Sequence, residues 1–415
     1  MEYQKQIMRN LTAEVVIVGG GTAGVFAAIS AARSGANTIL LEKNSMLGGT
    51  ITVAGVLFPG LFYAWGNKII SGPCWESIER TVALGGAVLP TITKKPERHY
   101  LEQIRLNQFI YTHVLHEMCK ESGVMVLANT MLSDAQEQED GIRLIATDKS
   151  GLFSIHAKKV IDATGDANLA GMMGYPFYPK ENVQPATLQN RLGGYDYEQV
   201  NLNQVRKVIS DAGMNAEQIL HFLRIKKIDN HIPAPVADTS WGKTNLETEA
   251  LASLAKLYQL LRQVEGLENL CIEWIASETG VRETNRIIGE ATVTAEDYLK
   301  GIHYPDAICY AFYPIDLHVP DGIDQTFLTE DTVPQIPYRA LIPKSSRHLL
   351  CAGRCISSDR YANSAIRVQA PCMAMGQAAG CAAALCAKQN IPVLELDYQS
   401  LNKALSDLGA IVPVQ

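Results

Sequence analysis

The stretch Glu14–Ala28, EVVIVGGGTAGVFAA, decides the fold. Its VVIVG run is apolar and β-branched, as expected for a strand buried on both faces. A helical pattern follows over 22–34, and Gly35 lies where a helix would be capped. The next run, NTILLE, reads as a second buried strand that ends at Glu42. The stretch therefore predicts a complete strand–helix–strand unit.

Three glycines between the first strand and the helix have the spacing GxGxxG. Gly19 allows a tight turn, Gly21 lets the backbone approach a pyrophosphate, and Gly24 lets the helix pack closely on the strands. The helix N-terminus offers free N–H groups and a partial positive charge to phosphates. Glu42 lies 18 residues after Gly24, where a carboxylate binds a ribose diol and disfavours a 2′-phosphate. The unit predicts a dinucleotide site.

Three later stretches bear on whether the dinucleotide is NAD or FAD. KNSMLGGT (43–50) places a glycine pair just after the acidic residue, although a surface turn would read the same way. KVIDATGD (159–166) is a strand that a hairpin precedes, with a turn at 150–151. LLCAGR (349–354) reads as another buried strand, followed by a loop and then by a helix of small residues that starts near Pro371. The N-terminus of this helix could face the N1/C2 carbonyl side of a flavin and stabilise negative charge on the reduced ring. A plain buried helix is the alternative for this segment.

Several motifs together resemble one family: GGGTAGVFAAISAARSG…LLEK, VIDATGD, GVRETNRIIGE, IPYRALIP and LLCAGRCIS…SAIRVQAPCMAMGQAAG. They are similar to the FAD-dependent oxidoreductase family, a glutathione-reductase-like group related at fold level to the fumarate reductase flavoproteins. The resemblance runs from about residue 14 to 387 and is weakest at about 180–270. It implies an α/β fold: a Rossmann-like FAD/NAD(P)-binding three-layer domain with a β-meander, plus an inserted α+β substrate or cap domain.

The resemblance also implies which residues hold FAD. No histidine or cysteine shows an obvious covalent flavin signature, so the expected FAD is non-covalent. The cofactor-binding residues carried over by position are Gly19, Gly21, Thr22, Ala23, Gly24, Glu42, Lys43, Gly49, Thr50, Met131, Ala163, Thr164, Gly165, Asp166, Gly353, Arg354, Gln369 and Ala370.

The expected FAD-binding domain is discontinuous, over 1–176 and 336–415, and the substrate or cap domain is 177–335, with 51–98 as a candidate contributor. Helices are expected at 100–122, 196–228 and 245–263 from apolar residues at three- and four-residue spacing. A second nucleotide fingerprint is missing, because Gly376 and Gly380 form GxxxG within a helix. A separate NAD domain is therefore not expected.

Arg282 and His318 are the first candidates for catalysis. An arginine fork can hold a carboxylate or polarise a carbonyl, although a salt bridge with Glu283 or Glu290 would explain Arg282 equally. His318, with Asp316 in YPIDLH, could take the proton from a substrate hydroxyl. A structural histidine is the alternative.

Further candidates lie in DRYANSAIR, just before the flavin-facing helix. Tyr361 and Arg367 complete the expected catalytic set with Arg282 and His318. No metal site is expected, because His113 and His116 share a helix face without a third ligand. Five C-terminal cysteines read as buried small hydrophobic residues: Cys351, Cys355, Cys372, Cys381 and Cys386.

Composition narrows the class of protein. The formal net charge is −7 and the pI about 5.8, which argues against nucleic-acid binding. The apolar segment 370–387 contains Pro371 and Gln377 and suits a buried helix better than a membrane span. The N-terminal MEYQKQIMRN lacks the apolar run of a secretory signal. A soluble, cytoplasmic protein is expected.

The resulting hypothesis is an FAD-dependent oxidoreductase that passes hydride between a small polar organic substrate and flavin N5. An NAD-dependent dehydrogenase and a non-catalytic or electron-transfer flavoprotein subunit are the alternatives. The expected partners are a small-molecule substrate and an unidentified electron acceptor or donor, without nucleic acid or membrane. A homo-oligomer is left open.

Overall fold

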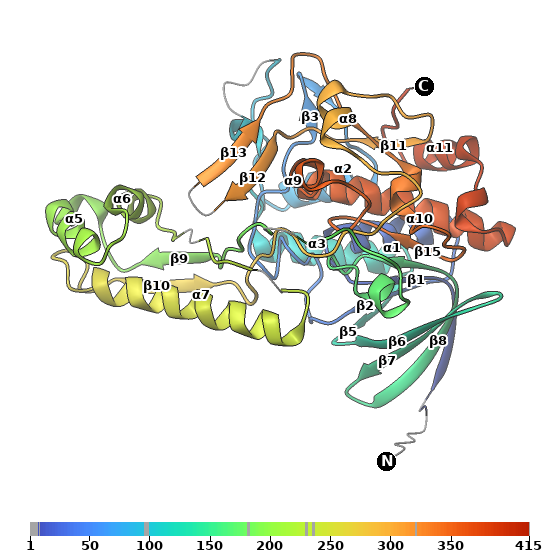
Figure 1. The fold of residues 1–415 in the computed structure, drawn as a ribbon, viewed down its shortest axis with the longest axis horizontal. Coiled ribbons are helices and arrows are strands. Elements are labelled where there is room, and N and C mark those ends of the chain that lie inside the picture. The colour runs from blue at the N-terminus through green and yellow to red at the C-terminus, as the bar shows by residue number, and fades with distance from the viewer. Residues whose placement is uncertain are drawn as a thin grey trace.

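The computed structural model describes residues 7, 9–94, 99–180, 183–228, 231–234, 237–319 and 322–414. A seven-stranded sheet forms the body of the molecule (Figure 1). Four of its strands are parallel neighbours, in the order β5 (Met125–Ala128), β2 (Thr38–Glu42), β1 (Asn10–Val18) and β8 (Gly151–Asp162). The register pairs Val18 with both Leu41 and Asp162, so these strands end together at one edge of the sheet. The expected strand–helix–strand unit and the mixed α/β fold are confirmed.

The expected β-meander is also present. β6 (Met131–Gln138) and β7 (Gly141–Asp148) run antiparallel and lead into β8 through a turn at 149–150. β7 pairs only with the first half of β8, and β15 (Leu349–Cys351) pairs in parallel with its last three residues. β15 therefore adds a fourth strand end to the edge formed by β1, β2 and β8.

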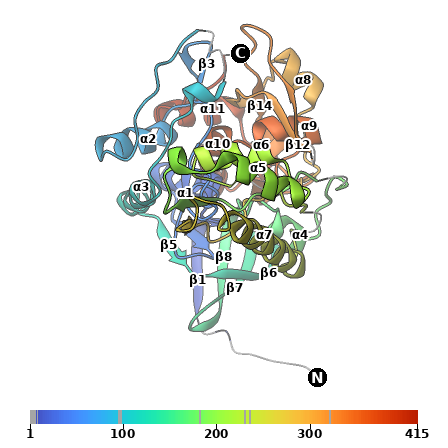
Figure 2. The ribbon, with the colours of Figure 1, turned by 90° about the vertical axis from the view of Figure 1, so that its left-hand side faces the viewer.

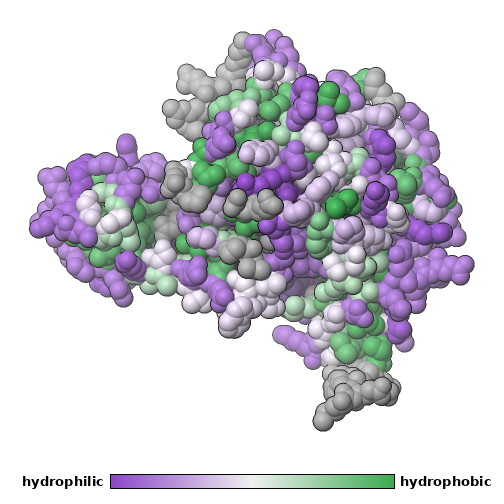
Figure 3. Space-filling model, viewed as in Figure 1, coloured by the Kyte–Doolittle hydropathy of each residue, from purple (hydrophilic) through white to green (hydrophobic). Residues whose placement is uncertain are grey.

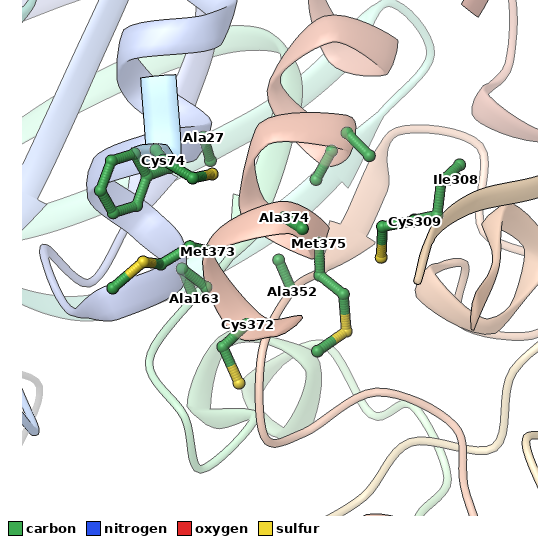
Figure 4. Packing of buried hydrophobic residues seen from close by; sticks show 14 of the residues in the cluster. Ala27, Cys74, Ala163, Ile308, Cys309, Ala352, Cys372, Met373, Ala374 and Met375 are labelled. Carbon is green, nitrogen blue, oxygen red and sulfur yellow. The ribbon is translucent and has the colours of Figure 1, made fainter. Parts of the chain in front are cut away.

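Helices α1 (Thr22–Arg33) and α10 (Gln369–Gln389) pack against each other at unusually short range. A Cβ atom at Gly376 would lie 2.0 Å from the carbonyl oxygen of Ala23, and one at Gly380 would lie 2.1 Å from that of Ala27. Figure 4 shows the small residues and methionines of α10 between Ala27 and Cys74 on one side and Ile308 and Cys309 on the other. The small-residue composition of α10 is thus explained by close helix–helix packing.

The same helix bears on the membrane question. Within the described residues, α10 alone is long and apolar enough to cross a membrane. Its most apolar 18-residue window is 94% buried inside the protein, which is typical of a core helix. The stretch 1–6, which bears on a secretory signal, lies outside the described residues.

A cap lobe with a core of its own projects from the body (Figures 1 and 2). Its buried apolar residues lie between Ala186 and Ala276, and its outer face in Figure 3 is mostly hydrophilic. The elements of the lobe are β9 (Asn190–Gly193), η2 (Tyr197–Gln199), α5 (Leu202–Asp211), α6 (Ala216–Arg224), α7 (Ser240–Leu261) and β10 (Cys271–Ile275).

The segment after the cap lobe packs on the body instead. Its buried residues from Val293 to Ile342 belong to the same core cluster as α1 and α10. The elements are α8 (Ala295–Lys300), β11 (Ala307–Tyr310), β12 (Ile315–Val319), β13 (Gly322–Thr326), β14 (Gln335–Pro337) and η3 (Tyr338–Leu341). The range 177–335 therefore divides between two cores, and its treatment as one domain stays a prediction.

The remaining described elements join the body. They are β3 (Tyr63–Ala64), β4 (Asn67–Lys68), α2 (Pro73–Ala83), η1 (His99–Glu102), α3 (Gln108–Glu121), α4 (Asn168–Met172), α9 (Arg360–Ile366), η4 (Val393–Glu395) and α11 (Tyr398–Asp407).

Three helix predictions need correction. The helix expected at 100–122 begins only at Gln108, because the Asn107 side chain accepts a hydrogen bond from the Ile110 N–H and caps it. The helix expected at 196–228 is two helices, separated at Gly213, whose φ is +73°. The loop expected before α10 contains α9, which the Asp359 side chain caps.

Candidate functional site

A single long cavity of about 1700 Å³ follows the carboxyl edge of the sheet and continues under the cap lobe. Residues at the ends of β1, β2, β8 and β15 line one part of it, and residues of the cap lobe line another. A pocket for one small ligand usually holds about 300–1,000 Å³. The volume therefore accommodates a dinucleotide together with a second molecule.

The fingerprint loop is shaped by backbone contacts. Gly19 has φ +101°, and a Cβ atom there would lie 2.6 Å from the carbonyl oxygen of Ala163. A Cβ atom at Gly24 would lie 1.8 Å from the Gly19 oxygen, so the helix touches the strand end directly. Gly24 thus supports the loop from behind, whereas Gly19 and Gly21 line the cavity.

The N-terminus of α1 faces this cavity without a capping side chain from the described residues. Its N-cap is Gly21, and Thr22 and Ala23 of the first turn line the cavity. A Cβ atom at Gly21 would meet only the Cα of Gly49, at 3.8 Å. Free N–H groups at a helix N-terminus, beside a glycine with space in front of it, suit a pyrophosphate.

Glu42 lies at the end of β2 and is buried. Its Oε2 accepts a hydrogen bond from the Gly20 N–H at 2.6 Å, and its Oε1 accepts one from the Asn44 N–H at 2.8 Å. Burial raises the pKa of this carboxyl, and the two backbone hydrogen bonds oppose that rise. Each carboxyl oxygen retains a second lone pair with which it can accept from a ribose hydroxyl.

The glycine-pair loop lies directly against the fingerprint. The Gly48 N–H donates to the Gly20 oxygen at 2.8 Å, and Gly49 has φ +50°. Gly49 and Thr50 line the cavity. The starts of α1 and α10 are also linked, because the Thr22 hydroxyl donates a hydrogen bond to Gln369 Oε1 at 3.4 Å.

The turn after β8 is fixed by Arg354. Its guanidinium donates to the carbonyl oxygens of Gly165 and Val281 and forms an ion pair with Asp166. Thr284 adds a hydrogen bond to Asp166 at 2.7 Å. Arg354 therefore joins the cofactor edge to the segment that leads out of the cap lobe. The cavity-lining residues of this turn and of β15 are Ala163, Thr164, Gly165, Asp166, Gly353 and Arg354.

The remaining cofactor candidates lie at the two ends of the cavity. Lys43 forms an ion pair with Glu278 at 2.6 Å, and Met131, at the start of β6, is 58% exposed. Gln369 begins α10 and lines the cavity, with its amide donating to the Val56 oxygen at 2.9 Å. Ala370 is buried behind it and does not line the cavity.

The two arginines of the expected catalytic set, Arg282 and Arg367, both donate hydrogen bonds to the segment 184–187. Arg282 donates to the Pro185 oxygen at 2.7 Å and to the Thr187 hydroxyl at 2.9 Å. Arg367 donates to Gln184 Oε1 at 3.2 Å, while its buried Nε has no hydrogen-bond acceptor among the described residues. Both arginines line the cavity. Glu283, one of the two partners considered for Arg282, lies 3.5 Å from Nη1 of Arg286 and 3.4 Å from Nε of Arg360.

His318 lies on β12 and lines the cavity with Asp316. Its Nε2 lies 3.1 Å from Asp316 Oδ2, and its Nδ1 lies 3.2 Å from Nε2 of His231. Burial lowers the pKa of His318, as do the nearby Arg282 and Arg367, and these effects outweigh the hydrogen bond to Asp316. Burial alone would raise the pKa of Asp316, but hydrogen bonds from His318 and Gln325 lower it to about 2. Near neutral pH, His318 is therefore neutral and Asp316 ionised.

Tyr361 is not brought to this site. It lies on α9, is 49% exposed, and does not line the cavity. Two lining residues that the sequence analysis missed are Tyr313 and Gln103, and the Gln103 amide donates to the Tyr313 hydroxyl at 3.5 Å. Tyr313 begins the YPIDLH stretch, two residues before β12, which is the signal that could have identified it.

FAD fits these residues. The uncapped helix N-terminus and the glycines suit its diphosphate, Glu42 suits a ribose, and the cavity leaves room for a second molecule. Binding would use the ends of β1, β2, β8 and β15, together with the first turns of α1 and α10.

The chain is similar to several known proteins. A thiamine thiazole synthase of Methanococcus vannielii is 27% identical over 170 residues, which are 39% of this chain and 59% of the relative. A digeranylgeranylglycerophospholipid reductase of Methanosphaera stadtmanae is 26% identical over 201 residues, 46% of each chain. The chain therefore spans about half the length of these curated relatives.

A solved structure of a geranylgeranyl bacteriochlorophyll reductase-like protein from Thermoplasma acidophilum aligns with 96% of this chain and 83% of its own. Its TM-score is 0.49 at 13% identity. The family of FAD dependent oxidoreductases matches residues 14–405, nearly the whole chain. This protein accordingly belongs to the FAD-dependent oxidoreductase family, and it is an enzyme whose cofactor is FAD.

Proposed function

We propose that this oxidoreductase passes hydride between a carbon atom of a small anionic organic substrate and N5 of FAD. The observation that supports this proposal is the excess of basic over acidic residues in the lining of the cavity. Nine lysines and arginines line the cavity against five acidic residues, although the whole chain has a formal net charge of −7. The basic residues are Lys43, Arg105, Arg191, Lys226, Lys227, Lys243, Arg282, Arg354 and Arg367, and the acidic residues are Glu42, Asp166, Asp238, Glu278 and Asp316.

Part of both sets is already engaged, and among the basic residues Lys43, Arg191, Lys243 and Arg354 form ion pairs. Asp166, Asp238 and Glu278 form ion pairs, Glu42 accepts two backbone hydrogen bonds, and Asp316 accepts from His318 and Gln325. A cavity with excess positive charge attracts anions and raises their local concentration. The diphosphate of FAD offsets part of this excess. The rest supports a second anion as the substrate.

Arg282 and Arg367 are the groups proposed to hold the substrate. Guanidinium forks match a carboxylate in geometry and charge. Asp316 and His318 lie at the same wall and are proposed to exchange the proton that accompanies the hydride.

Family membership sets aside the alternative of an NAD-dependent dehydrogenase without FAD. A cytoplasmic location, a separate electron acceptor or donor and a homo-oligomer stay predictions.

A paired screen tests the proposal. Small hydroxy-, amino- and unsaturated carboxylic acids are mixed without oxygen with the oxidised or reduced FAD enzyme, each beside its neutral amide. We expect the flavin absorbance to change with some acids and not with their amides. Arg282→Met and Arg367→Met should weaken apparent binding of a reactive acid by about 10- to 100-fold, because each removes charge-assisted hydrogen bonds.

The matched control is Arg206→Gln. Arg206 is an exposed arginine of the cap lobe, paired with Glu217 and outside the cavity lining. Equal reaction of acids and amides would show that charge does not select the substrate. Reaction that persists unchanged in both cavity variants would remove Arg282 and Arg367 from the proposal.

A further inference from the structure

Glu278, in the segment that leads out of the cap lobe, lies beside the end of β2, where Glu42 suits a ribose of FAD. Its Oε1 accepts hydrogen bonds from Lys43 Nζ at 2.6 Å and from Asn44 Nδ2 at 3.2 Å. The Asn44 N–H in turn donates to Glu42 Oε1 at 2.8 Å. Asn44 therefore joins the two carboxylates, and all four residues line the cavity.

The backbone around Glu278 is held on both sides. The Ser277 N–H donates to the Val53 oxygen at 3.1 Å. The N–H and the hydroxyl of Thr279 donate to the two carboxyl oxygens of Glu247, at 2.8 and 2.6 Å. The side chain of Glu278 therefore projects from a backbone that is fixed before and after it.

The charge of Lys43 acts on both carboxylates. Burial raises the pKa of Glu42, the charge of Lys43 opposes that rise, and the charge of Glu278 adds to it. Burial alone would raise the pKa of Glu278 too, but the hydrogen bond and the charge of Lys43 lower it. Within the described part of the chain, Lys43 forms its ion pair with Glu278 and not with Glu42. The second lone pairs of Glu42 are thus left for ribose hydroxyls.

We propose that Glu278 is a positioning residue for FAD, which holds the Lys43 ammonium away from Glu42 so that Glu42 can accept from the ribose hydroxyls of the adenosine half. Without the negative charge at Glu278, the ammonium of Lys43 turns to its neighbour Glu42 and occupies the lone pairs that the ribose needs. The segment that leads out of the cap lobe thereby completes the adenosine part of the cofactor site. This role depends on FAD and not on the identity of the substrate.

FAD titration of the FAD-free full chain tests this role. Glu278→Gln keeps an oxygen acceptor for Asn44 but removes the charge that attracts Lys43, so the Kd for FAD should rise about 10-fold, as for the loss of one charge-assisted hydrogen bond. Lys43→Met breaks the same ion pair but leaves no competing ammonium, so its Kd should stay within about 3-fold of the unaltered value. The double variant Glu278→Gln/Lys43→Met should regain the affinity that Glu278→Gln loses.

Competition by ADP and 2′-deoxy-ADP locates the effect at the ribose. ADP should displace FAD from the unaltered protein more readily than 2′-deoxy-ADP, because Glu42 accepts from the 2′-hydroxyl, and Glu278→Gln should remove most of this preference. The matched control is Glu217→Gln, which removes a carboxylate that pairs with Arg206 on the exposed face of the cap lobe, outside the cavity lining. It should change neither value. Urea unfolding verifies that each variant is folded.

An unchanged Kd in Glu278→Gln would overturn the role of Glu278. A double variant that binds FAD as weakly as Glu278→Gln would also overturn it, because Glu278 would then only tie down the segment that carries it. A preference for ADP that persists in Glu278→Gln would contradict an action at the ribose. Should Glu278→Gln not fold, the ADP preference of Lys43→Met decides: a retained preference supports the role, and a lost one contradicts it.

Discussion

The two parts of the cavity are built by different means. The cofactor part is made of backbone. At positions such as Gly19, Gly24 and Gly49, the φ angle is positive or another part of the backbone lies in direct contact, and there is no space for a side chain. The proposed substrate part is made of side chains such as Arg282 and His318, which come from separate segments. A backbone site depends on spacing along the chain, whereas a side-chain site depends on tertiary packing.

The largest expected effect comes from a pair of glycine substitutions that probes the cofactor part. In Gly24→Ala the new methyl group would lie 1.8 Å from the Gly19 oxygen, so α1 must move away from the sheet. We expect the free energy of unfolding to fall by about 3 kcal/mol or more. In Gly21→Ala the nearest protein atom is 3.8 Å away, so the fold should persist while FAD affinity falls.

Urea unfolding and FAD titration of both variants separate the two effects. If Gly24→Ala were as stable as the unaltered protein, backbone contact would not define this part of the cavity. If Gly21→Ala bound FAD normally, the space before Gly21 would not be where the cofactor approaches.

An intermediate effect is expected in the substrate part from Asp316→Asn. The folded protein lowers the pKa of Asp316 to about 2, below its ordinary value of 3.8. The ionised carboxylate therefore stabilises the fold fully above about pH 4, and this stabilisation is lost as the pH falls toward 2. The shift corresponds to about 2 kcal/mol. Unfolding free energies at pH 6 and pH 3 should show a deficit in the variant that shrinks at the lower pH; a constant deficit would contradict the assignment.

The smallest effect is expected on the outer face of the cap lobe. Arg206 and Glu217 form an exposed ion pair at 2.8 Å between α5 and α6. Arg206→Gln should leave the unfolding midpoint nearly unchanged, because solvent screens such pairs. A clear loss of stability, measured at low and at high salt, would mean that charge at the lobe surface matters as it does in the cavity.

This contrast explains how much could be predicted from the sequence. The fingerprint, the meander and the ends of β8 and β15, at Asp162 and Cys351, follow from local patterns of glycines and apolar runs, and the structure has them. Sequence patterns also gave Arg282, Arg367 and His318 as catalytic candidates, and all three line the cavity.

The remaining features depend on contacts that no local pattern encodes. His231 reaches His318 across 87 positions of sequence, and Gln103 reaches Tyr313 across 210. Tyr361 was predicted from its place before α10, but the unrecognised helix α9 leaves it half exposed. The start of α3 was misplaced because the cap at Asn107 competes with an apolar pattern that continues through it.

The contact between α1 and α10 has a consequence for how FAD enters. Both helices begin at the cavity, and Gly376 and Gly380 leave no gap through which one could slide past the other. The distance between the two helix starts is thus set when the core forms, before any cofactor arrives. FAD therefore meets helix starts whose relative position is already fixed, so little ordering entropy is lost in the protein on binding.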